Sequence, residues 1–587
     1  MAPRDTWGAE GHAPLMVGRP AERGHTAPQP ASRTRRAARS ATALHLIRLC
    51  LTAALCIALT AALCLTTLTA CSPSNTGAGQ ASAVLMRGGG PDPDSLDPQR
   101  ARSAESQLIL RDLCEGLTAL DRNAAVAPGI ASSWTATPDG KTYTFKHRPN
   151  ARWSNGDKIV AADFVAGLRR LVDPATASAY AQVIDAMANA SDIVAGKKPP
   201  ETLGVTAPDE ATVVIELNTP TPYLPQLLSH SSTCPVHRPT LAAKGGAYAR
   251  PGVMVSSGAY ILAEWVQNSH VLLTRNHSYW NDSATRIDAV KYLFISDNSA
   301  ELTRYRAGEL QITYAVPRAD YDWIKAHLAG QLHIAPQLNT YFYGFNLTRP
   351  PFKDQPGLRR ALSLVIDREK LAQLVLRVGE LPAYGWVPPG INNYTPQSFD
   401  YATTPIEARI AEARRLYKEA GYSDAHPLSF ELRYNPGEVH TKLAVAIAAA
   451  WKNALGVDVH LTAAEFKSLL QDIDRGDVQM FRSSWVGDYN DPHTFLQYLK
   501  SDFGINLPHY QNPYYDGLLE RAARTTDPTQ RRDLLEQAER TALHDHPLIP
   551  IYFYVNKHLV KPEVTGWYDN VMNVVYSKDL GLRKATP

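Results

Sequence analysis

The residues Leu68-Thr69-Ala70-Cys71 have the types and spacing needed for lipidation of a cysteine. They close an uncharged run of 22 residues, 49–70, that follows a stretch rich in arginine. A basic region, an apolar segment and a small residue before cysteine are typical of a bacterial export signal cleaved at that cysteine. We therefore expect a signal peptide over residues 1–70 and an acylated Cys71. The alternative is an uncleaved membrane helix, because a run of this length can span a bilayer.

Residue patterns that mark enzymes are missing from the sequence. It contains no Gly-x-Ser-x-Gly elbow, no His-Glu-x-x-His helix and no phosphate-binding glycine loop. His544-Asp545-His546 could be drawn as a metal pair, but adjacent residues of this kind more often cap a helix. We expect a binding protein rather than an enzyme, without a cofactor or a metal site.

Cysteine usage and charge both bear on where the chain works. Of the six cysteines, three precede Cys71, so the chain beyond it holds only Cys114 and Cys234. In an oxidising compartment such a pair is often a disulfide, and two separate buried thiols are the alternative. The net charge of +3 is near balance and no basic tract follows the leader, so nucleic acid is not an expected partner. Residues 71–82 have the composition of a flexible tether.

Hydrophobic periodicity is clearest between residues 400 and 490. Thr404-Pro405 is typical of a helix start with proline at the first helical position, and Gly421 of a helix end. Strand, helix, strand, helix and strand patterns follow at residues 428–434, 440–455, 457–461, 466–475 and 478–485. This order predicts a parallel sheet with right-handed crossovers, in which ligands bind beyond the carboxyl ends of the strands. The residues just after Trp485 are therefore the place to look for a site.

That segment, residues 482–492, reads Arg-Ser-Ser-Trp-Val-Gly-Asp-Tyr-Asn-Asp-Pro. It resembles the oligopeptide-binding proteins of bacterial ABC importers, a family of extracytoplasmic solute-binding proteins that also contains dipeptide binders. Further matching stretches run in order along the chain, at residues 93–98, 111–117, 153–156, 173–178, 258–260, 304–309, 381–384 and 552–556. The resemblance therefore covers the chain from about residue 84 to its C terminus.

The resemblance implies an α/β, two-lobed periplasmic-binding-protein fold with a hinge and an extra small domain inserted in the N-terminal lobe. Lobe I is expected to combine residues 83–116, 237–338 and 556–587. The inserted domain II is expected at 117–236, and lobe II, the peptide lobe, at 339–555. Chain crossings near residues 338 and 555 would form the hinge.

The resemblance also assigns roles to residues at the amino end of a bound peptide. Asp488 matches the carboxylate that pairs with the α-ammonium of the ligand, and the alternative is a solvated aspartate in a turn. Ser484 and Trp485 match the stretch whose backbone pairs with the peptide as an added strand. The facing strand would correspond to residues 102–105. Trp485 is also open to interpretation as an ordinary core residue.

Cations and aromatic residues are implied for the rest of the pocket. Arg482 and His440 match residues near the ligand carboxylate, which a guanidinium can hold with two hydrogen bonds. A structural ion pair and a helix-start residue are the respective alternatives. Arg377 is a further candidate for the carboxylate, and Tyr180 and Tyr341 match aromatic pocket positions.

Three positions depart from the family pattern. Asn339 and Val486 stand where those oligopeptide binders carry a cysteine pair, so that bridge is absent here. Phe342 stands where a tyrosine is usual, which removes one hydroxyl from the pocket. These departures leave the preferred peptide length open.

The expected function is that of a lipid-anchored receptor outside the cytoplasm, which captures short peptides for an ABC permease and its ATPases. We expect it to be a monomer. Rival ligands on the same fold are dipeptides, glutathione, cell-wall peptides and a nickel chelate. A secreted peptidase or esterase and an adhesion or signalling protein are rivals from other classes.

Overall fold

The computed structural model describes residues 84–583. The predicted signal peptide (1–70), the tether (71–82) and the lipidated Cys71 all lie outside the described residues. Within the described part of the chain, no helix is both long and apolar enough to cross a bilayer.

A six-stranded sheet in the order β12-β16-β11-β15-β13-β14 contains the region predicted as a parallel sheet. Its strands are β11 (Leu332–Phe345), β12 (Leu381–Pro382), β13 (Ser429–Tyr434), β14 (Asp458–Ala463), β15 (Met480–Val486) and β16 (Leu548–Leu559). Strand β13 is parallel to both β14 and β15, as the alternation of strands and helices predicts. Strand β15 is antiparallel to β11, so the complete sheet is mixed.

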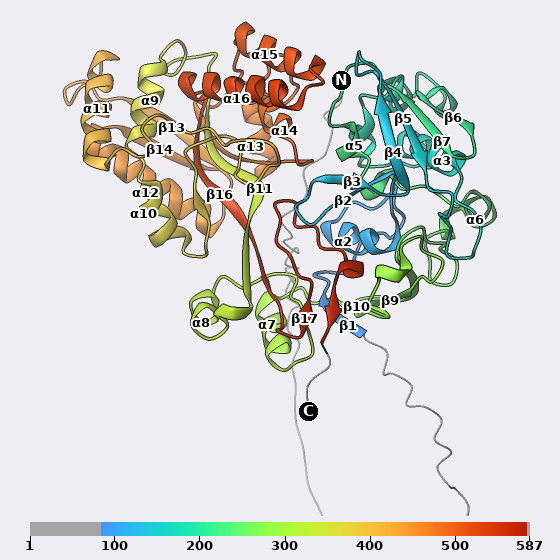
Figure 1. The fold of residues 1–587 in the computed structure, drawn as a ribbon. Helices are drawn as coiled ribbons and strands as arrows, with labels where there is room; N and C mark the ends of the chain where they lie inside the picture. The colour runs from blue at the N-terminus through green and yellow to red at the C-terminus, as the bar shows by residue number, and fades with distance from the viewer. Residues whose placement is uncertain (1–83, 584–587) are drawn as a thin grey trace, which may run out of the picture. The chain divides into compact units, whose positions relative to one another are not determined.

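Helices gather around this sheet (Figure 1). They include α9 (Pro356–Leu364), α11 (Ile406–Glu419), α12 (Glu438–Leu455), α13 (Phe466–Asp474), α15 (Pro513–Arg524) and α16 (Pro528–Asp545). The predicted start of α11 is wrong by one residue. Pro405 is the N-cap and Ile406 the first helical residue, without a side-chain cap. His546 ends α16 as its C-cap in a left-handed conformation, which agrees with a capping interpretation of the His-Asp-His run.

Two further four-stranded sheets are formed by other parts of the chain. One has the order β1-β10-β9-β8 and consists of β1 (Val84–Gly88), β8 (Tyr260–Val266), β9 (His270–Arg275) and β10 (Ala289–Leu293). The other has the order β4-β5-β7-β6 and consists of β4 (Ala131–Ala136), β5 (Thr142–His147), β6 (Val205–Asp209) and β7 (Thr212–Glu216). Helix α2 (Ala104–Leu113) packs on β8 and helix α3 (Ala161–Val172) on β6 and β7.

Each of the three sheets has its own apolar core. The core of the six-stranded sheet is built mainly from residues 338–552, and that of the β4–β7 sheet from residues 117–228. The third core joins residues 85–113, 254–312 and 560–580, so distant segments of the chain share one interior. The boundaries of the lobes and of the inserted domain stay a prediction.

Strands β11 and β16 extend beyond the other strands of the six-stranded sheet and continue as a pair to residues 332 and 559. They pair antiparallel from Leu332 opposite Leu559 to Gly344 opposite Leu548. The ladder is interrupted between Pro336 and Thr340, next to the predicted crossings.

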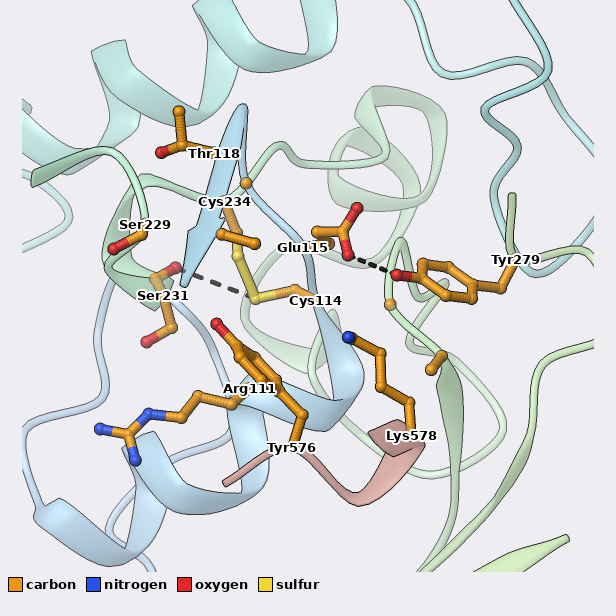
Figure 2. Close-up of a pocket in the computed structure, with 14 residues that line it drawn as sticks. Arg111, Cys114, Glu115, Thr118, Ser229, Ser231, Cys234, Tyr279, Tyr576 and Lys578 are labelled. Atoms are coloured by element: carbon orange, nitrogen blue, oxygen red, sulfur yellow. Dashed lines mark hydrogen bonds between the residues drawn. A yellow bond between two sulfur atoms is a disulfide. The ribbon is translucent and has the colours of Figure 1, made fainter. Parts of the chain in front are cut away.

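A disulfide joins Cys114, which follows α2, to Cys234 (Figure 2). Their Cα atoms are 6.2 Å apart. The small cavity beside the disulfide has a volume of about 20 Å³, enough for a water molecule but not for a peptide. Glu115 faces it, and its carboxylate accepts hydrogen bonds from the Tyr279 hydroxyl and from Trp280 Nε1.

Candidate ligand-binding site

Asp488 lies just beyond the carboxyl end of β15, in the turn that leads to the short helix α14 (His493–Leu496). Its backbone N–H donates to Thr494 Oγ1 at 3.1 Å. Among the side chains that the structure describes, none makes a hydrogen bond or an ion pair with its carboxylate. Water reaches this exposed side chain, yet the surrounding protein removes enough hydration to raise the pKa of Asp488 to about 6.

Tyr180, from a distant part of the chain, interacts electrostatically with Asp488. Its hydroxyl donates to the backbone oxygen of Arg102 at 3.2 Å, and its ring lies 4.7 Å from that of His230. Burial raises the pKa of Tyr180, and the negative charge of Asp488 raises it further. The two side chains are therefore near enough for their charges to interact, but the contacts described for Tyr180 are with Arg102 and His230.

A second cluster is centred on Arg482, a buried residue of β15. Its guanidinium donates to Asn435 Oδ1 at 2.8 Å and to the Tyr554 hydroxyl at 3.2 Å, and it lies 4.6 Å from the centre of the Tyr341 ring. The His440 ring, from the first turn of α12, lies 5.6 Å from the same tyrosine. Arg482, His440 and Tyr341 therefore form one cluster.

The electrostatics of this cluster keep its histidine neutral. Burial, together with the positive charge of Arg482, lowers the pKa of His440 to about 3. The guanidinium is therefore the charged group of the cluster, and the oxygen atoms of Asn435 and Tyr554 that accept from it are neutral.

Ser484 and Trp485 are held by the ladder between β15 and β11. They lie opposite Tyr341 and Thr340, respectively. The indole of Trp485 is buried, donates to the Thr494 backbone oxygen at 2.7 Å and packs on Tyr498, as the core interpretation predicts for the side chain. On the opposite side of β15, the ladder with β13 ends at Phe481, so no strand of the described chain covers the edge beside Ser483 and Ser484.

One expectation about the surroundings needs correction, and the role of Arg377 stays a prediction. Residues 102–105 are not a strand, because Ser103 is the N-cap of α2 and accepts from the Ser106 N–H. Glu105 therefore lies in the first helical turn, where the helix dipole favours an acid. Arg377 makes an exposed ion pair of 2.6 Å with Asp322 of α8 (Tyr321–His327), and none of its described contacts reach the Arg482 cluster.

Sequence reasoning missed Asn435 and Tyr554 as partners of Arg482. Asn435 directly follows the carboxyl end of β13, so the rule that located Asp488 also indicates this residue. Tyr554 lies within the matching stretch 552–556, but nothing local to that stretch marks it as a neighbour of Arg482.

The chain matches a known protein family over most of its length. The sequence profile of the bacterial extracellular solute-binding proteins, family 5 (middle region), matches residues 125–507. The chain belongs to this family. Its fold is accordingly the two-lobed solute-binding fold, as the resemblance implies.

Relatives within the family carry different ligand names. The chain is 38% identical over 508 residues to the periplasmic oligopeptide-binding protein OppA of Salmonella typhimurium, with 85% of this chain and 93% of OppA covered. It is 39% identical over 495 residues to the probable deoxycholate-binding periplasmic protein YgiS of Escherichia coli K12, with 84% and 92% covered. The solved unliganded open form of the murein tripeptide-binding protein MppA is similar at a TM-score of 0.82 and 36% identity, with 86% of this chain and 98% of MppA covered.

Proposed function

We propose that this protein is the extracytoplasmic receptor of an ABC importer for short peptides. It binds a peptide by its α-ammonium group and backbone and delivers it to a membrane permease driven by ATPases. The family and the names of OppA and MppA support a peptide ligand and a binding rather than a catalytic role. The lobe boundaries given above and the lipid anchor at Cys71 are part of this proposal.

The observation that carries the proposal is the electrostatic environment of the Asp488 carboxylate. A carboxylate with a raised pKa and no cationic partner among the described residues is electrostatically unsatisfied. A primary ammonium group placed against it supplies the missing charge and three hydrogen-bond donors. Every unmodified peptide carries such a group, whatever its side chains, so one carboxylate serves many sequences.

The other site residues account for the rest of the ligand. The edge of β15 beside Ser483 and Ser484 offers main-chain groups to an extended peptide. Arg482, with neutral His440 and Tyr341 around it, supplies positive charge for a carboxylate. We assign Tyr180 to the side of the site near Asp488, because the charge of that carboxylate contributes to the raised pKa of Tyr180. Arg377 stays a candidate for the ligand carboxylate, and in that role it would exchange its exposed ion pair with Asp322 for the ligand.

A steroid acid is the second candidate ligand, because YgiS is as similar to this chain as OppA. Deoxycholate carries a carboxylate and no amine, so it would use Arg482 and leave Asp488 without a partner. A peptide therefore uses both Asp488 and Arg482, whereas deoxycholate uses Arg482 alone.

Calorimetric titration with trialanine, N-acetyl-trialanine and deoxycholate tests the proposal. We expect trialanine to bind, N-acetyl-trialanine to bind at least tenfold more weakly, and deoxycholate not to compete. Equal affinity for the two peptides refutes the ammonium pair, and binding of deoxycholate alone supports the steroid acid. Mass spectrometry of the recovered peptide checks for cleavage, and cleavage would favour the alternative of a secreted peptidase.

A further inference from the structure

The turn that carries Asp488 is contacted by side chains from residues 117–236, which lie outside the six-stranded sheet. The Tyr223 ring stacks on the Tyr489 ring, with centroids 4.6 Å apart and planes at 6°. The same ring lies 4.8 Å from that of His493. Tyr489 directly follows Asp488, so this aromatic stack lies next to the proposed ammonium site.

Hydrogen bonds reinforce the stack on the neighbouring residue. Gln226 Nε2 donates to the backbone oxygen of Asn490 at 2.9 Å, and Asn490 Nδ2 donates to the backbone oxygen of Ala124 at 2.8 Å. Ala124 is fully buried and belongs to the apolar core of the six-stranded sheet, although it lies in the loop between β2 (Thr118–Leu120) and β3 (Val126–Pro128). The β2–β3 loop and the short helix α5 (Leu224–Leu227), whose N-cap is Tyr223, therefore both hold this turn.

Hydrogen bonds within residues 489–531 fix the conformation of the turn that Tyr223 and Gln226 contact. Asp491 accepts two hydrogen bonds from the Arg531 guanidinium, at 2.7 and 2.8 Å, and both side chains are largely buried. The Asp491 carboxylate also accepts from the backbone N–H of His493 at 2.9 Å. The Tyr489 hydroxyl lies 3.0 Å from His493 Nδ1, which fixes the two rings that face Tyr223.

Asp488 itself has little else to fix its direction. Its one described hydrogen bond is the backbone contact with Thr494, and its side chain projects into solvent. The position of Tyr489 therefore sets the direction of the backbone that carries the carboxylate.

We propose that Tyr223 and Gln226 are positioning residues for the ammonium site, because they hold the 489–493 turn so that Asp488 meets the amino end of the ligand. This inference rests on the proposed function. Neither residue needs to touch the ligand. An aromatic stack of this kind is worth about 0.5–1.5 kcal/mol, which corresponds to a loss of about twofold to tenfold in affinity when the ring is removed.

Titrations of Tyr223→Leu with trialanine and N-acetyl-trialanine test the inference, with Tyr223→Phe as the matched control that keeps the ring. Tyr223→Leu is expected to bind trialanine about fivefold more weakly and N-acetyl-trialanine as well as the unmodified protein does. Tyr223→Phe is expected to stay within about twofold of the unmodified protein for both peptides. An equal loss for both peptides in Tyr223→Leu means that the ring has a general structural role and overturns the inference.

A double-mutant cycle gives the second readout. Once Asp488→Asn has removed the charge, adding Tyr223→Leu should cause no further loss of trialanine binding. Additive losses refute the positioning role. Gln226→Leu is the alternative variant if Tyr223→Leu does not fold, and the same pattern is expected from it. If Asp488→Asn alone leaves the trialanine affinity unchanged, the proposed function fails. If Asp488→Asn weakens trialanine binding but Tyr223→Leu does not, only the positioning role is refuted.

Discussion

Replacing Asp488 by asparagine should weaken ligand binding without weakening the fold. Removing one partner of a hydrogen-bonded charge pair in a binding site costs about 2–5 kcal/mol. Because water reaches Asp488 before the ligand arrives, we take the lower end, about 2 kcal/mol, which is about a thirtyfold loss of affinity.

The effect of the same change on stability has the opposite sign. The pKa of Asp488 is raised to about 6 in the folded protein, so its negative charge disfavours folding above pH 6, and this penalty disappears below the ordinary pKa of the group. Asp488→Asn removes the penalty at pH 7.5. Since water screens an exposed charge, we expect a gain of at most about 1 kcal/mol and a Tm that is unchanged or about 1–2 °C higher.

Calorimetric titration with trialanine and a thermal scan, both at pH 7.5, measure the two quantities on one preparation. Asp424→Asn is the control, because Asp424 is an exposed acid in the turn between α11 and β13. It should leave both affinity and Tm unchanged. A fall in Tm for Asp488→Asn that accounts for the loss of binding, or an unchanged affinity, refutes the reasoning.

Four other perturbations address the remaining features. The affinity for trialanine should fall about tenfold from pH 7 to pH 5 as Asp488 takes up a proton, and a titration series in which Asp488→Asn shows the same slope would contradict this. Arg482→Met should weaken trialanine about tenfold but leave trialanine amide unchanged, since only the former offers a carboxylate. Cys71→Ala should move the protein from the membrane to the soluble fraction on cell fractionation, and retention would favour an uncleaved helix. Replacing Cys114 and Cys234 together by alanine should lower the free energy of unfolding by about 3 kcal/mol. An unchanged midpoint of denaturant unfolding would show that the disulfide does not stabilise the fold.

The parallel half of the six-stranded sheet was predictable because its information is local. Alternating apolar residues and glycine helix ends mark β13, α12, β14 and their neighbours to within about two residues. No local sequence pattern predicts the antiparallel pairing of β15 with β11, since this pairing depends on contacts between segments distant in sequence. The start of α2 was missed for a different reason. The Ser103 side chain outweighs the extended conformation that the resemblance implied for residues 102–105.

The candidate site was predicted in part. The strand-end rule points to the region of Asp488, and it also indicates Asn435. The rule gives no direction for side chains, so it does not reveal that the indole of Trp485 faces the core. The stack of Tyr223 on Tyr489 and the bridge between Cys114 and Cys234 join residues whose spacing in the sequence says nothing about their distance in space.

The break in the β11–β16 ladder has a mechanical consequence. Around residues 333–336 and 555–558, the described chain contains only these two strands in ladder contact. A ribbon of two hydrogen-bonded strands resists stretching and shear along its length, but it bends and twists easily across its thin direction. We therefore expect motion at these two strands to take the form of bending or twisting rather than extension.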